Sequence, residues 1–242
     1  MKNTKNKICV LLVLIVLAVL TAAVPASAVP LSESYGYNYN GWDSWTPINN
    51  LTDGINKSIG EMGYDAKKWY RTSAYYVRRT MGQDAIFLIM NHANSGFVAC
   101  ENAGTVTYLS ANSTPLSYAY SLQNKFQGTT ELYDLRFAAF VGCNTALTDT
   151  TGNGFGNLRD MASSLGVDTV MAFTNTIDYN QANFFMKRFY AYANNGMTIN
   201  DAYYAALNEC TGIWHELEDV AKYASLLGYP QDTLDPAAYG VH

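Results

Sequence analysis

The chain has 242 residues, with 15 Lys and Arg against 20 Asp and Glu, which gives a formal net charge of −5 at pH 7. Nucleic-acid binding depends on basic side chains that neutralise phosphates, so this acidic composition predicts no nucleic-acid partner. Charged residues make up only 14% of the chain, and 19 Tyr residues supply much of the remaining polarity.

The first 28 residues have the pattern of a signal peptide. Lysines at positions 2, 5 and 7 precede an apolar run over residues 8–24, and Ala26-Ser27-Ala28 has the small-x-small form of a cleavage site. An uncleaved anchor helix is the alternative, because the run is almost long enough to span a bilayer. Since the cleavage site follows directly, we expect cleavage after Ala28. A secreted or cell-surface protein without a membrane span would result.

Residues 29–242 are expected to form one domain, because no repeat, linker or low-complexity block divides them. Short apolar runs that end at Gly or a polar residue predict strands buried on both faces, and apolar residues at helical spacing predict the helices between them. The expected elements in chain order are a strand at 35–39, helices at 51–63 and 72–81, a strand at 85–91, a hairpin of strands at 97–100 and 105–109, a strand at 137–141, a helix at 158–165, a strand at 167–174, and helices at 180–194, 198–210 and 213–227.

This order predicts an α/β fold with a mainly parallel central sheet and helices on both faces. We expect the hairpin to lie at an edge of that sheet.

Two of the buried strands lead into a side chain that can do chemistry. The run Phe137–Val141 passes through Gly142 into Cys143, and the run over residues 85–91 ends at His92. Parallel strands end at a common edge of the sheet, where open α/β folds bind ligands, so we expect the thiol and the imidazole to meet there. A histidine beside a cysteine can take its proton and produce a nucleophilic thiolate. The alternative for each residue taken alone is a packed structural side chain.

Residues 29–242 contain three cysteines, and an odd number in an exported protein suggests one disulfide and one free thiol. We expect a disulfide between Cys100 and Cys210, which leaves Cys143 free. Three buried, unpaired thiols are the alternative, because connectivity cannot be deduced from sequence.

At these residues the chain resembles the caspase-like cysteine peptidases, a group that includes caspases, legumains, gingipains, separases and CHAT-domain proteins. The resemblance extends from about Leu51 to Leu207, within a domain core of about residues 51–210, and follows the order of the elements. The CHAT-domain members look most similar, because Cys143-Asn144-Thr145 and the Gly-rich loop after it are like theirs. So is the later pattern Leu165-Gly166-Val167 followed by Val170-Met171-Ala172-Phe173.

The resemblance implies a three-layer α/β sandwich and a cysteine endopeptidase that hydrolyses peptide bonds through an acyl-enzyme. Cys143 would be the nucleophile and His92 the general base and acid. The backbone N–H groups of Ala93 and Cys143 would hold the developing oxyanion. Such an enzyme acts on proteins or peptides and needs no cofactor.

Polar residues near the strand ends are candidates for a substrate pocket. Asn144 follows Cys143, and Asn175 and Asp178 follow the third buried strand. The alternative for the last two is a polar surface turn.

The chain departs from the family pattern at two points. Ala93 stands where the family usually has Gly after the histidine, and alanine would be strained there if the position requires a positive φ. The caspase motif Q-A-C-x-G is replaced by Gly142-Cys143-Asn144. Ala93 favours a second hypothesis, an inactive caspase-like domain that binds a partner through the aromatic segment at residues 35–45. A transferase that uses the same dyad is a third.

The remaining motifs predict neither a metal nor a cofactor. The sequence contains no H-E-x-x-H, no C-x-x-C and no carboxylate-rich calcium loop. Gly152-x-Gly154-x-Gly156 lacks the full phosphate-loop pattern, so we interpret it as a flexible loop beside the substrate. His215 lies beside acidic residues on a predicted helix, and a solvated helix face explains it better than catalysis.

Overall fold

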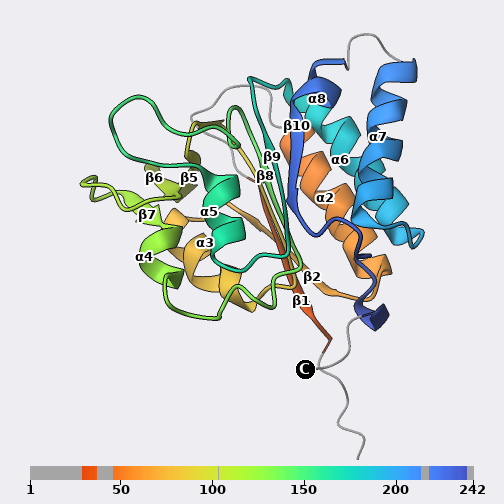
Figure 1. Cartoon of the computed structure of the whole chain (residues 1–242), viewed down its shortest axis with the longest axis horizontal. Coiled ribbons are helices and arrows are strands. Elements are labelled where there is room, and N and C mark those ends of the chain that lie inside the picture. The colour runs from red at the N-terminus through yellow and green to blue at the C-terminus, as the bar shows by residue number, and fades with distance from the viewer. Residues whose placement is uncertain (1–28, 37–45, 103, 214–217, 239–242) are drawn as a thin grey trace, which may run out of the picture. The chain divides into compact units, whose positions relative to one another are not determined.

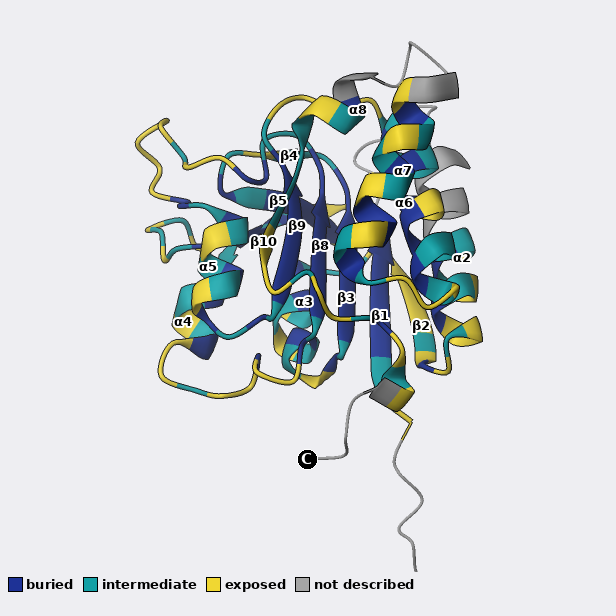
Figure 2. Cartoon of the chain, turned by 45° about the vertical axis from the view of Figure 1, so that its right-hand side comes forward, coloured by how far each residue is buried: buried dark blue, intermediate teal, exposed yellow. Residues whose placement is uncertain are grey.

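The main sheet of the computed structural model, seen nearly edge-on in Figure 1, has six strands in the order β10-β9-β8-β3-β1-β2, which Figure 2 labels. Five strands run parallel, and β10 is antiparallel to its neighbour β9. The strands are β1 (Leu31–Gly36), β2 (Asp65–Tyr70), β3 (Ile86–Met90), β8 (Phe137–Val141), β9 (Thr169–Phe173) and β10 (Ala224–Gly228). The expected mainly parallel sheet is therefore confirmed.

The structure describes residues 29–36, 46–102, 104–213 and 218–238. The expected signal peptide at 1–28, most of the aromatic segment at 35–45 and His215 lie outside these ranges. Residues 30–240 form one unit by their contacts. No helix within the described ranges is long and apolar enough to cross a membrane.

Helices cover both faces of the main sheet (Figures 1 and 2). One face carries α2 (Thr46–Glu61), α6 (Tyr179–Asn194), α7 (Ile199–Ile213) and α8 (Glu218–Tyr223). The other carries α3 (Ala74–Thr80), the 3₁₀ turn η1 (Met81–Gln83), α4 (Leu122–Phe126) and α5 (Leu158–Ser164). A second 3₁₀ turn, η3 (Pro236–Ala238), lies near the end of the described chain.

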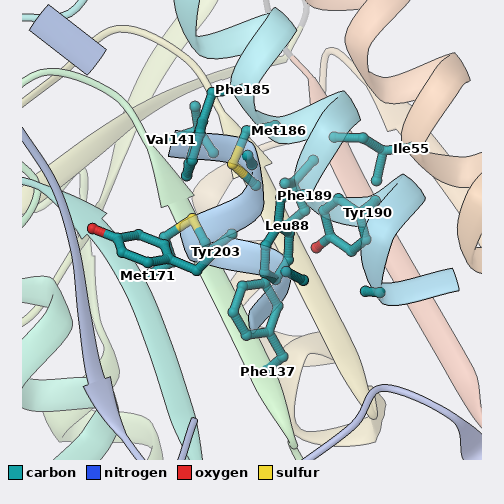
Figure 3. Packing of buried hydrophobic residues seen from close by; sticks show 14 of the residues in the cluster. Ile55, Leu88, Phe137, Val141, Met171, Phe185, Met186, Phe189, Tyr190 and Tyr203 are labelled. Carbon is teal, nitrogen blue, oxygen red and sulfur yellow. The ribbon is translucent and has the colours of Figure 1, made fainter. Parts of the chain in front are cut away.

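The two faces hold separate hydrophobic cores, because alternate residues of a strand point to opposite sides of a sheet. Leu88 of β3 packs with the α2 and α6 side chains, whereas its neighbour Phe87 packs with α3. Figure 3 shows the first core, in which Leu88 and Phe137 lie against Phe189. Since β3, β8 and β9 are buried along their whole length, both faces of each strand must be apolar. This explains their unbroken apolar runs.

The predicted hairpin is present, but it belongs to a second sheet and not to an edge of the main one. Strands β4 (Ala93–Asn94), β5 (Phe97–Asn102), β6 (Thr105–Ser110) and β7 (Ala119–Ser121) pair in that order. β4 follows β3 almost directly and pairs antiparallel with β5, so the chain turns out of the main sheet before the hairpin begins. The apolar side of the hairpin packs into the core beneath α3.

The end of the chain also differs from expectation. A helix was expected over residues 213–227, but within its described part α8 ends at Tyr223 and residues 224–228 form β10. The backbone of β10 pairs along the whole of β9, whose other edge is occupied by β8. Tertiary pairing has overridden the helical pattern there. Between the helices expected at 51–63 and 72–81, residues 65–70 form β2, a strand at the other edge of the main sheet.

Candidate active site

His92 and Cys143 occupy equivalent positions at the carboxyl edge of the main sheet. β3 and β8 are adjacent and parallel, with Met90 opposite Val141, and the Asn91 N–H donates to the Val141 carbonyl at 3.2 Å beyond the last pair. His92 follows Met90 by two residues, as Cys143 follows Val141. Both side chains are half-buried. The two strand ends therefore bring the imidazole-bearing and thiol-bearing segments side by side.

Gly142 allows these two segments to approach closely. A Cβ atom on Gly142 would lie 2.5 Å from the Cβ of Ala93 and 2.6 Å from the carbonyl oxygen of Asn91. Distances this short are incompatible with any side chain. The residue before Cys143 is therefore Gly because the His92 segment passes directly against it.

Asn91 fixes the backbone around His92 and is a residue that sequence reasoning missed. Its side chain is buried; the amide donates to the Ala99 carbonyl at 2.5 Å, and Oδ1 accepts from the His92 N–H at 2.6 Å. The Ala99 N–H donates in turn to the His92 carbonyl at 2.9 Å. An Asn at the end of an otherwise apolar strand was the available signal, because a buried amide must find partners.

Thr145 performs the same task for the Cys143 segment. Its buried hydroxyl donates to the Phe140 carbonyl at 2.8 Å and accepts from the Phe173 N–H at 3.0 Å. The Ala146 N–H donates to the Phe173 carbonyl at 2.8 Å. These bonds tie the turn after β8 to the end of β9, so the position of Cys143 is set by two strands.

Tyr179, which sequence reasoning also missed, lies beside both reactive residues. Its ring meets the His92 ring edge to face, with centroids 5.3 Å apart and planes at 84°. The Tyr179 hydroxyl is buried and has no hydrogen-bond partner among the described residues. Burial raises its pKa above the ordinary value, and the neighbouring Cys143 raises it further. Its place at the start of a helix, just after the third buried strand, was the sequence signal.

The electrostatic setting favours a neutral imidazole. Burial lowers the pKa of His92 below its ordinary value, because the charged form loses hydration. A neutral imidazole carries a lone pair on one ring nitrogen and can act as a base. The Cys143 thiol lies 3.9 Å from the Ile177 carbonyl oxygen, a weak contact for a sulfur donor.

The backbone groups expected to hold an oxyanion differ in their surroundings. The Cys143 N–H donates no hydrogen bond to any described residue. Ala93 belongs to β4, opposite Val98 of β5. Ala93 is free of the backbone strain that a positive φ would impose on alanine. Among the described residues other than glycine, only Arg71 and Asn144 have a positive φ.

Gly96, three residues after Ala93, does need to be glycine. Its φ is +80°, and a Cβ atom there would lie 2.4 Å from the Gly156 carbonyl oxygen. The loop Gly152-x-Gly154-x-Gly156 therefore reaches the His92 segment through its last glycine.

The three candidate pocket residues are in different situations. The Asn144 N–H donates to the Asn175 carbonyl at 3.0 Å, and its side-chain amide reaches Oδ1 of Asn94 at 3.4 Å. Asp178 is exposed and caps α6, since its Oδ1 accepts from the backbone N–H groups of residues 180 and 181. Asn144 and Asn175 thus lie together beside Cys143, whereas Asp178 has a structural task. A pocket role for the three stays a prediction.

The predicted disulfide is wrong, because Cys100 and Cys210 are both free, buried thiols. Cys100 belongs to the core on the α3 face of the sheet, and Cys210 belongs to the core on the α6 face. The sheet lies between them. Burial raises the pKa of Cys100 to about 12 and that of Cys210 to about 11, so both stay protonated at neutral pH.

No group of three or more His, Cys, Asp or Glu residues within the described ranges could hold a metal ion.

Comparison with known proteins identifies the fold. No family model matches the sequence, and no curated protein matches it significantly. Among solved structures, the Arg-specific cysteine proteinase gingipain R (RGPB) matches with a TM-score of 0.57 and 10% identity over 84% of this chain and 46% of that chain. Caspase-1 from Spodoptera frugiperda matches with a TM-score of 0.52 and 9% identity over 84% of this chain and 87% of that chain.

A complex of the pro- and mature domains of RgpB from Porphyromonas gingivalis matches with a TM-score of 0.53 and 10% identity, over 85% of this chain and 48% of that chain. The chain thus spans about half the length of the gingipain chains that it matches. Identities this low establish the fold alone, and the fold is that of the caspase-like cysteine peptidases. The greater similarity to CHAT-domain members stays a prediction.

Proposed function

We propose that this protein, which has a caspase-like fold, is a cysteine endopeptidase. Cys143 is the nucleophile, and His92 takes the thiol proton and passes it to the leaving amine. The observation that carries the proposal is the register of β3 and β8. Met90 opposes Val141, so the two reactive residues follow paired positions on adjacent parallel strands. The half-buried imidazole, whose pKa is lowered by burial, is the neutral base that such a reaction needs.

In the proposed reaction His92 takes the proton of the Cys143 thiol, and the sulfur attacks the carbonyl carbon of a peptide bond. The carbonyl oxygen becomes negative and is held by the N–H groups of Cys143 and Ala93. Collapse of this intermediate breaks the C–N bond, and His92 gives its proton to the leaving amine. Water activated by His92 then hydrolyses the thioester and restores the thiol.

Protein or peptide substrates are supported by the structural neighbours, which are named as a cysteine proteinase and a caspase. Asn144 and Asn175 lie beside Cys143 and would offer amide groups to the substrate backbone or side chain. Since amides donate and accept hydrogen bonds but carry no charge, they fit a polar, neutral part of the substrate.

Replacement of the nucleophile tests the mechanism. In the full chain, Cys143→Ala should lower peptide hydrolysis by more than about 1,000-fold and abolish labelling by a thiol-directed acyl inhibitor. His92→Gln should lower hydrolysis to a similar level, because the two residues act as a unit. Cys210→Ala is the matched control, since it removes a buried thiol on another element and should leave turnover unchanged. Full activity in Cys143→Ala would refute the mechanism.

An inactive binding domain is the competing function, and its main support was Ala93. Because φ of Ala93 is not positive, alanine carries no backbone strain at this position. Alkylation with iodoacetamide distinguishes the two functions in the folded protein. An activated Cys143 should react faster than a free cysteine at pH 7, and His92→Gln should abolish the difference. Reaction at the rate of an ordinary thiol would favour the binding domain.

We also propose that the protein is exported and that cleavage follows Ala28. The support is the sequence of residues 1–28, with its lysines, apolar run and Ala26-Ser27-Ala28 site. Sequencing of the N-terminus of the protein recovered outside the cell should begin at Val29. Recovery of the chain with residues 1–28 attached to the membrane would support an uncleaved anchor instead.

A further inference from the structure

Tyr179 is held by the rigid part of the fold. It is the first residue of α6, directly after the cap Asp178, and it packs against the same core as Cys143. Phe185 and Phe189 anchor this helix on the sheet, as Figure 3 shows. The position of the Tyr179 ring therefore depends on a helix that packs on the main sheet and not on a surface loop.

The ring lies beside both members of the proposed dyad. It meets the His92 imidazole edge to face, with centroids 5.3 Å apart and an angle of 84°. Cys143 acts electrostatically on its hydroxyl, and the Cys143 sulfur lies 3.9 Å from the carbonyl of Ile177, two residues before Tyr179. One aromatic side chain thus borders the imidazole and the thiol.

We propose that the ring of Tyr179 is a positioning element that holds the His92 imidazole in the orientation needed for proton exchange with Cys143. This inference rests on the proposed peptidase function. Asn91 fixes only the backbone of His92, through the bond from the His92 N–H to Asn91 Oδ1 at 2.6 Å. The terminal torsion of a histidine is broad, so backbone contacts do not set the plane of its ring.

The perpendicular contact with Tyr179 acts on the plane of the imidazole itself, because such a contact is favourable over a narrow range of ring planes. The ring also keeps water from one side of the imidazole, in keeping with the lowered pKa of His92. Proton exchange depends steeply on alignment, and a misplacement of about 1 Å costs about 100-fold in rate. Orientation of His92 by Tyr179 is thus a requirement of the chemistry and not only of stability.

The aromatic ring of Tyr179, and not its hydroxyl, positions the His92 imidazole. The hydroxyl is buried without a hydrogen-bond partner among the described residues, so it anchors nothing in the resting protein. Phenylalanine would preserve the edge-to-face contact. Leucine would fill part of the volume without a ring plane.

Three variants of the full chain test the proposal. Tyr179→Leu should lower kcat by about 10- to 100-fold with little change in KM, and Tyr179→Phe should stay within about threefold of the native enzyme. Tyr203→Leu is the matched control. Tyr203 lies on the same face of the sheet and meets Phe185 edge to face at 5.9 Å and 88°, so its loss should leave kcat unchanged well below the unfolding temperature.

The titration of His92 is the second readout, and it does not depend on peptide hydrolysis. NMR should follow the imidazole signal, assigned by its absence in His92→Gln. Tyr179→Leu should raise the pKa of His92 by admitting water, and the acid limb of kcat/KM should move to higher pH by the same amount. Tyr179→Phe should change neither. A residue with only a structural role would not move these quantities.

Several results would overturn the proposal. Tyr179→Leu with unchanged kcat and an unchanged His92 pKa would show that the ring does not act on the imidazole. Equal damage in Tyr179→Phe would assign the effect to the hydroxyl, and a gain in kcat in Tyr179→Leu would show that the ring obstructs the site. If native and Cys143→Ala proteins are equally inactive, the peptidase proposal fails, while the NMR titration still decides whether Tyr179 sets the environment of His92.

Discussion

At the scale of single residues, Gly142 has no room for a side chain where the His92 and Cys143 segments meet. A Cβ atom there would lie 2.5 Å from the Ala93 Cβ and 2.6 Å from the Asn91 oxygen. Gly142→Ala should therefore push the His92 segment away from β8. We expect a loss of about 1–3 kcal/mol in the free energy of unfolding, measured by urea denaturation, together with lower peptidase activity.

Gly60→Ala is the control for this substitution. Gly60 is exposed near the end of α2, and the nearest atom to an added Cβ would be 3.9 Å away. Because alanine has a higher helix propensity than glycine, this variant should gain up to about 1 kcal/mol. Equal stability of the two variants would mean that the segments at Gly142 can separate without cost.

Asp84 is buried, and neither of its carboxylate oxygens has a hydrogen-bond partner within the described chain. Burial raises its pKa to about 10, with a further contribution from the negative charge of Glu33. The folded protein therefore keeps a proton that the unfolded chain releases above about pH 4. Between those two values stability falls as pH rises, because the folded state binds more protons than the unfolded state.

Asp84→Asn should flatten this pH dependence. The amide cannot ionise, so the variant should gain about 1–3 kcal/mol more over the native protein at pH 8 than at pH 5. Urea denaturation at the two pH values measures the difference. Asp134→Asn, at an exposed position, is the control and should show no such trend. If the stability of Asp84→Asn and of the native protein changes with pH in the same way, the raised pKa of Asp84 is wrong.

At the scale of elements, one threonine links the ends of β8 and β9. The Thr145 hydroxyl donates to the Phe140 carbonyl and accepts from the Phe173 N–H. Thr145→Val keeps the shape but leaves these buried backbone groups unpaired. We expect a loss of about 1–3 kcal/mol in the free energy of unfolding and slower alkylation of Cys143, because the turn that carries the thiol loosens.

Thr211→Val is the matched control for Thr145→Val. Thr211 is exposed on α7, where its hydroxyl bonds the Leu207 carbonyl of the same helix. This substitution should change stability by less than about 0.5 kcal/mol. If Thr145→Val and Thr211→Val lose similar amounts of stability, the Thr145 hydroxyl contributes no more than an exposed one.

At the scale of the whole molecule, the main sheet separates the two buried thiols. Cys100 lies in the core beneath α3 and Cys210 in the core beneath α6, and neither forms a disulfide within the described chain. We therefore expect dithiothreitol to leave the Tm unchanged. A Tm that falls on reduction, or a peptide map that links Cys100 to Cys210, would contradict this arrangement.

Much of the fold could be predicted from local patterns. Apolar runs such as Phe137–Val141 identify buried strands, because burial on both faces requires an unbroken hydrophobic segment. The same runs indicated the strand ends at His92 and Cys143. The hairpin at residues 97–110 was also readable from its two strands and its turn, but the sheet to which it belongs was not.

The sequence by itself therefore determined the apolar buried strands β3, β8 and β9, most helices and the two residues that follow β3 and β8, since hydrophobic period is a property of neighbouring residues. Only the tertiary structure decided that Tyr179 and Asn91 adjoin His92, that residues 224–228 pair with β9 and that Cys100 and Cys210 lie on opposite faces. These features depend on contacts between segments far apart in the chain. Such contacts are chosen by the packing of the complete core, which no local pattern encodes.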